Sequence, residues 1–276
     1  MLQLPAGGVV WATEDPTLAA PELTIGAPGI VAFEQGRILK PLDFYTRSNY
    51  SAFIQRYELL IYRASDADLV DPLVTLSMPV ANVSRLEWDG QLPERYRYRQ
   101  GDQLAYVLRA YGADGNIDET QPRQIQLVSQ AEADGSGRRL REATEKAHGA
   151  NLSLEQAQQQ SLIDEVFSGN GLRQQNISIH GSRVRIQGRN IADGMGLTIN
   201  GESYPVDLER KFVAEYLMPV GSHDFVIGVK QGEQAAQVDL PLGLPLEAQQ
   251  STVIPIDLNI SFNDLPDLAR ALRDAV

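Results

Sequence analysis

The sequence predicts an all-β protein built from two β-sandwich modules that are joined by a helical linker. With 276 residues the chain is longer than most single domains, so length alone favours about two of them. Two regions carry short runs of β-branched and aromatic residues separated by Asp-Gly or Asn-Gly turns. Between these regions the alternating pattern gives way to helical spacing. We therefore expect a β module, a helical linker and a second β module.

The first forty residues, 1–40, contain four prolines and several glycines, and they predict an extended lead-in that contributes little to a core. The first sandwich follows at 41–129. Its aromatic residues Trp88 and Tyr106 are expected in the core. The predicted strands are bounded by residues typical of turns and cover 53–63, 72–78, 84–88, 103–111 and 123–128.

The linker is predicted at 130–172. Residues 131–137 are small and polar, and two helices are expected after them, at 138–148 and 153–168. Ser153 followed three residues later by Gln156 is typical of a capping box, in which each residue's side chain accepts a hydrogen bond from the other's backbone N–H. The linker is therefore expected to be structured.

The second, smaller sandwich is predicted at 173–245. Val184 and Ile186 alternate with arginines, which places the two apolar side chains inward. The segment 246–276 is expected to add a strand at 253–262 and an amphipathic helix at 265–276. The other strands of this module are predicted at 176–181, 183–187, 197–200, 211–216, 223–229 and 237–240.

Charge and composition narrow the classes of partner. The formal net charge is -12, from 36 acidic and 24 basic residues, which disfavours binding to nucleic acid. The chain contains no run of about 18 to 20 apolar residues, so no transmembrane segment is expected. Cysteine is absent, which excludes disulfides and thiolate metal sites. The first residues lack the features of a secretory signal, and we expect this chain to be a fragment with its signal upstream.

The sequence offers few constellations able to perform chemistry. The three histidines are far apart, and no nucleophile elbow, phosphate loop or dinucleotide fingerprint occurs. We therefore expect no catalytic residues and a protein that is not an enzyme. One oxygen-rich segment, with Asp114, Asn116 and Asp118, is a candidate calcium site, although it lacks the glycine and the distal glutamate of a full calcium loop. No other cofactor is expected.

Two stretches carry a resemblance to known modules. The first runs from Arg56-Tyr-Glu-Leu-Leu-Ile-Tyr-Arg63 through Trp88-Asp-Gly90 to Tyr106-Val-Leu-Arg-Ala-Tyr111, and it resembles the immunoglobulin-like modules that precede the barrel in large bacterial outer-membrane proteins. It is also similar to the immunoglobulin-like module of the flagellar hook cap. The second, Val184-Arg-Ile-Gln-Gly188 with Leu197-Thr-Ile-Asn-Gly201, looks like bacterial surface modules.

The resemblance implies immunoglobulin-like or fibronectin-like sandwiches located in the periplasm or at the cell surface, in association with the outer membrane. It also implies that the chain mediates assembly or adhesion through protein partners in the envelope. The alternative is a carbohydrate-binding module, in which exposed aromatic residues such as Tyr96 and Tyr98 bind a glycan. Binding without turnover distinguishes both hypotheses from a hydrolase.

Overall fold

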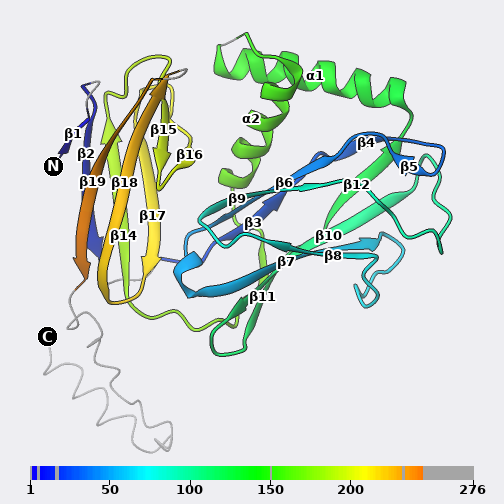
Figure 1. Ribbon diagram of the computed structural model, residues 1–276, viewed down its shortest axis with the longest axis horizontal. Helices are drawn as coiled ribbons and strands as arrows, with labels where there is room; N and C mark the ends of the chain where they lie inside the picture. The colour runs from blue at the N-terminus through cyan, green and yellow to red at the C-terminus, as the bar shows by residue number, and fades with distance from the viewer. Residues whose placement is uncertain (1, 5–6, 16–18, 150, 232–233, 245–276) are drawn as a thin grey trace, which may run out of the picture.

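The computed structural model describes residues 2–4, 7–15, 19–149, 151–231 and 234–244 (Figure 1). The described part is mostly β, with several sheets and two α-helices, as the sequence predicted. Residues 246–276, for which a strand and an amphipathic helix were predicted, lie outside the described residues. None of the helices in the described ranges is both long and apolar enough to cross a membrane.

The first module is a sandwich of two sheets with a shared core. Its aromatic centre includes Phe44, Trp88 and Tyr106, all nearly inaccessible to solvent, so the prediction for the last two residues is confirmed. Phe44 meets Tyr106 edge to face at 5.3 Å between ring centroids. The smaller sheet contains β3 (Leu23–Gly26), β6 (Leu42–Ser48) and β9 (Val83–Trp88), and the larger contains β4 (Ile30–Glu34), β5 (Arg37–Ile38), β7 (Ile54–Arg63), β8 (Val74–Met78), β10 (Gln103–Gly112), β11 (Ile117–Thr120), β12 (Arg123–Val128) and β13 (Leu172–Gln174).

The second module is also a sandwich, with a separate core. Val184 and Ile186 are fully buried in it, as their alternation predicted, and Phe225 packs on Tyr216 in the same core. One sheet has the order β1 (Leu2–Gln3), β2 (Val9–Asp15), β14 (Ser182–Arg189), β17 (Phe212–Met218), and the other has the order β16 (Glu202–Tyr204), β15 (Gly196–Ile199), β18 (Gly221–Gln231), β19 (Gln234–Leu244).

The N-terminal segment differs from the extended lead-in that the prolines and glycines predicted. Strand β2 lies inside the second module, where it pairs with β14 over seven residues, from Asp15 opposite Arg183 to Val9 opposite Arg189. Strands β3 and β4 belong to the first module, and Leu23 and Phe33 are buried in its core. Long-range strand pairing therefore overrides the local signal of the prolines, which lie between the strands.

The two helices predicted between the β regions are present, but the first is longer than predicted. Helix α1 (Gln130–His148) begins eight residues before the predicted start, after the cap Ser129, whose side chain accepts a hydrogen bond from Glu132 N. Gly137 allows the close approach of the two helices, because a Cβ atom there would lie 3.2 Å from the side chain of Leu154. Helix α2 (Leu154–Phe167) has the predicted capping box of Ser153 and Gln156. It packs its buried side chains against the smaller sheet of the first module, near Tyr45.

Candidate functional site

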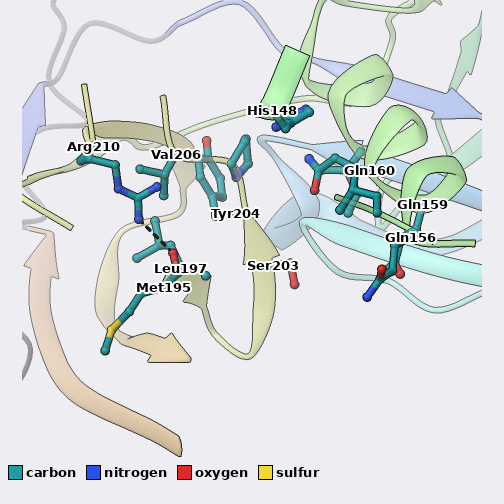
Figure 2. A pocket seen from close by; sticks show the side chains of 14 residues that line it. His148, Gln156, Gln159, Gln160, Met195, Leu197, Ser203, Tyr204, Val206 and Arg210 are labelled. Atoms are coloured by element: carbon teal, nitrogen blue, oxygen red, sulfur yellow. Dashed lines mark hydrogen bonds between the residues drawn. The ribbon is translucent and has the colours of Figure 1, made fainter. Parts of the chain in front are cut away.

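The helices and the second module meet around a cleft of about 390 Å³ (Figure 2). One wall is the end of α1 with one side of α2, and the other wall is the β15–β16 hairpin and the loop before β17. Such a volume lies within the range of small-molecule sites. The lining residues are His148, Leu152, Gln156, Gln159, Gln160, Ile163, Met195, Gly196, Leu197, Ser203, Tyr204, Pro205, Val206 and Arg210.

The polar side chains of the helical wall are largely bonded to groups of the helices themselves. Gln156 closes the capping box, with its Oε1 accepting from Ser153 N at 2.9 Å. Gln160 donates to Asp164 Oδ1 at 2.8 Å, and His148 Nε2 lies 2.7 Å from Asp164 Oδ2. The His148–Asp164 contact joins the end of α1 to the last turn of α2, and the other two bonds stabilise α2 itself.

The opposite wall is held in a similar way by Arg210. Its guanidinium donates to the backbone oxygens of Ile191 at 2.9 Å and of Ala192 at 2.5 Å, and more distantly to Met195 O at 3.1 Å. A guanidinium that bridges three carbonyls fixes the loop 190–195 beside the hairpin. The Arg210 guanidinium is therefore hydrogen-bonded to the backbone of this loop, and Figure 2 shows one of these bonds.

Aromatic contacts lie next to the cleft, where Tyr204 is one of its lining residues. Phe167 at the end of α2 meets Tyr204 of β16 edge to face, with 4.8 Å between ring centroids. Arg47 of β6 places its guanidinium 4.8 Å from the centre of the Phe167 ring and pairs with Glu22 at 2.6 Å. Burial raises the pKa of Tyr204 to about 12, so its phenol is neutral and donates to Val213 O at 3.1 Å. The stack connects the first module, helix α2 and the second module.

A partly buried carboxylate lies at the same junction. Glu202, the first residue of β16, accepts a hydrogen bond from Val83 N of β9 at 2.8 Å, which is a direct bond between the second module and the first. Burial raises the pKa of Glu202 to about 7, against the lowering effect of the backbone N–H groups of Val83 and Asn82. This carboxyl group therefore titrates near neutral pH.

Further contacts join the modules on the side of η1 (Ser51–Phe53). Leu217 N of β17 donates to Asn49 O at 2.6 Å, and the Leu217 side chain is buried in the core of the first module. Phe53 meets His180 edge to face at 6.5 Å between ring centroids. We call the set of contacts formed by Arg47, Phe167, Tyr204, Glu202–Val83 and Asn49–Leu217 the module junction.

The candidate calcium residues do not converge on a shared site. Asp118 is fully buried, and its Oδ1 accepts from Asn176 N at 2.6 Å and Ile177 N at 2.8 Å, while Oδ2 accepts from the Tyr50 hydroxyl at 2.6 Å. Asp114 instead lies in the exposed turn, where it accepts from the backbone and side chain of Asn116. The described residues contain no group of three or more histidine, cysteine or acidic side chains arranged to hold a metal ion. The structure thus assigns Asp114 and Asn116 to the turn and Asp118 to the interior.

Tyr96 and Tyr98, proposed as glycan-binding aromatics, lie together in the loop before β10. Their rings are edge to face at 6.4 Å and pack on the core of the first module. The guanidinium groups of Arg63 and Arg95 lie 4.9 and 5.0 Å from the centre of the Tyr96 ring. A sugar that stacked on Tyr96 would compete with these arginines, so the geometry adds no support for glycan binding here.

The sequence reasoning missed Glu202, Arg47 and the Tyr50–Asp118 pair. Glu202 follows an Asn-Gly turn, which predicts an exposed hairpin end, and nothing in its local sequence indicates burial against another module. Asp118 was noticed only for its oxygen atoms. Three consecutive polar residues of β11, Asp118 to Thr120, are buried, and no periodicity in the local sequence indicates this.

The sequence matches no known family model and no curated protein. Among solved structures, the chain has a distant similarity to the fibronectin(III)-like modules of CbhA from Clostridium thermocellum, with 11% identity and a TM-score of 0.25, covering 80% of this chain and 93% of that one. It is similar at 11% identity and a TM-score of 0.24 to the cycloalternan-degrading enzyme from Trueperella pyogenes, covering 76% of this chain and 29% of that one. The same enzyme in complex with isomaltose gives 10% identity and a TM-score of 0.24.

Proposed function

We propose that this chain is a non-enzymatic structural and interaction unit of a bacterial cell-envelope protein, in which two immunoglobulin-like modules form one rigid body. Its task is to hold binding surfaces at a fixed spacing and to mediate assembly or adhesion through protein partners. The proposal places the protein in the periplasm or at the cell surface, in association with the outer membrane.

The observation that carries this proposal is the discontinuity of the second module. Its sheet contains β2 from the start of the chain and β14 from beyond residue 181, and the whole first module lies between them in sequence. The chain therefore passes between the modules twice, once on each side of the first module. Two covalent passages restrict a hinge far more than the single linker that usually joins tandem modules.

The junction contacts restrict the remaining motion. The hydrogen bonds Glu202–Val83 and Leu217–Asn49 come from two strands of the second module, β16 and β17. They reach two segments of the first module, β9 and the residue after β6. The polar groups of the adjacent cleft are mostly bonded within the chain, as expected for a structural joint. A rigid spacer needs such a joint, and a flexible tether does not.

The envelope assignment is supported by the sequence. The acidic charge of -12, the absence of cysteine and the resemblance to bacterial surface modules all agree with it. Two apolar side chains stand out on the surface, Leu208 at 88% and Val70 at 77% exposure, one on each module. They are suitable positions for detecting a partner.

The test is in-cell photo-crosslinking combined with fractionation in the producing bacterium. A photoreactive amino acid replaces Leu208 or Val70, and the same cells without irradiation are the control. We expect the protein in the envelope fraction, with a crosslinked protein adduct from an exposed position only after irradiation. Recovery of the protein entirely in the cytosol, or turnover of a polysaccharide panel by the purified chain, would contradict the proposal.

A further inference from the structure

Glu202 occupies an unusual position for a carboxylate. The Asn200-Gly201 turn, with positive φ at both residues, reverses the chain tightly and presents Glu202 at the start of β16. From there its side chain reaches the first module, where Oε2 accepts from Val83 N at 2.8 Å. This bond fixes the end of the β15–β16 hairpin against β9.

The surroundings of Glu202 supply little compensation for a negative charge. The phenols of Tyr57 on β7 and Tyr216 on β17 are close enough to interact electrostatically with it, and both are buried and neutral. Arg47 of β6, the cation that interacts with the neighbouring Tyr204, is paired with Glu22 at 2.6 Å. Among the ion pairs of the described residues none includes Glu202.

We infer that Glu202 is a pH-dependent latch, which holds the β15–β16 hairpin on the first module while its carboxyl group is protonated and weakens that contact when the group ionises. A protonated carboxyl group keeps a carbonyl oxygen that accepts the Val83 N–H. An ionised one accepts the same bond more strongly, but it must be desolvated without a paired cation. Because Glu202 is partly buried and has no ion pair among the described residues, desolvation is the larger effect, and it raises the pKa of this group.

The direction of the pH dependence follows from linkage. The pKa of Glu202 is about 7 with the latch closed, against an ordinary value of 4.5 in the open state. Between pH 4.5 and pH 7 the closed state therefore binds more protons than the open state. The free energy that protonation of Glu202 contributes to the closed state is complete below pH 4.5 and is lost as pH rises through 7. Between pH 6 and pH 8 we expect the closed-to-open ratio to fall about tenfold.

The Glu202 latch makes the contact between the two modules depend on pH, wherever in the cell the protein is located. In acidic surroundings the modules are locked at the junction. At mildly alkaline pH the hairpin gains freedom, and Ser203 and Tyr204, which line the cleft on the same strand, move with it.

The test is an NMR titration of the whole chain from pH 5 to 8.5. The Glu202 carboxyl carbon and the Val83 amide are expected to titrate together near pH 7. Hydrogen-exchange protection at Val83, corrected for intrinsic rates, is expected to fall about tenfold from pH 6 to pH 8. Titration of Glu202 near 4.5 with constant protection at Val83 would overturn the inference.

Two variants separate the latch from general effects of pH. Glu202→Gln keeps an acceptor oxygen without a titrating proton, so protection at Val83 should become independent of pH. Glu87→Gln alters an exposed acid on the same strand as Val83 and should leave the tenfold change intact. An unchanged pH slope in Glu202→Gln, or its loss in Glu87→Gln, would contradict the assignment. If Glu202→Gln fails to fold, the same comparison is made with Glu202→Asp, whose shorter side chain should reduce protection at Val83 below pH 6.

Discussion

At the scale of single residues, the buried Asp118 illustrates how an acidic side chain organises this chain. Its two oxygens bind the Tyr50 hydroxyl and the backbone N–H groups of Asn176 and Ile177. Tyr50 precedes η1, which contacts β17, and Asn176 lies where the chain enters the second module. The carboxylate therefore fixes two segments that lead to the junction, which explains its burial better than metal binding does.

Replacing this carboxylate should be costly. Asp118→Ala leaves two backbone donors and one hydroxyl buried without an acceptor, and we expect the free energy of unfolding to fall by about 3 kcal/mol. Chemical denaturation measures this. Asp114→Ala, in the exposed turn of the same hairpin, is the matched control and should cost less than about 1 kcal/mol. Equal losses in both variants would show that Asp118 has no special role.

A second prediction at this scale concerns the close approach of β14 and β17. Gly188 lies opposite Phe212, and a Cβ atom at that position would lie 2.2 Å from the Phe212 ring. Gly188→Ala must therefore displace the ring from the core and should destabilise the protein by about 1 to 3 kcal/mol. Gly196→Ala, where the nearest atom is at 3.7 Å, is the control for lost backbone freedom. Thermal unfolding that does not distinguish the two variants would contradict this packing.

At the scale of elements, the sequence predicted the type of most segments better than their partners. The strands at 53–63 and 103–111 and the helix capped by Ser153 were predicted because periodicity and capping are local signals. The partnership of β2 with β14 depends on residues about 170 positions apart. A local reading of the prolines around residues 9–15 could not supply it, because each proline lies outside the strand.

The role of β2 can be tested by a polar substitution. Val10 is fully buried in the second core, so Val10→Asp should destabilise the second module by at least about 3 kcal/mol. Thr13→Asp places the same charge on an exposed position of the same strand and should change the free energy of unfolding by less than about 1 kcal/mol. Loss of dispersed amide signals from β14 and β18 would report the damage. If both variants kept these signals, residues 9–15 would be a lead-in after all.

The candidate sites show the same division between local and tertiary information. Asp114 and Asn116 form the turn that their sequence indicates. The raised pKa of Glu202 depends on its burial against the first module, which no local pattern encodes. The sequence therefore identifies the acidic residues, but it does not distinguish Glu202, whose pKa burial raises to about 7, from the others.

At the scale of the whole molecule, we expect the two modules to behave as one body. Two chain passages and the junction contacts connect cores that are otherwise separate. Below neutral pH the latch adds to this connection, so rigidity should be greatest there. The acidic net charge opposes close packing of the modules to a small extent and is screened by salt.

The most direct test is backbone ¹⁵N relaxation of the intact chain at pH 6. We expect the amides of β7 and β10 in the first module and of β14 and β18 in the second to fit a single rotational diffusion tensor, with a correlation time appropriate to the full mass of 30.4 kDa. If each module instead required its own tensor with a shorter correlation time, the modules would move independently, and the claim of one rigid two-module body would be wrong.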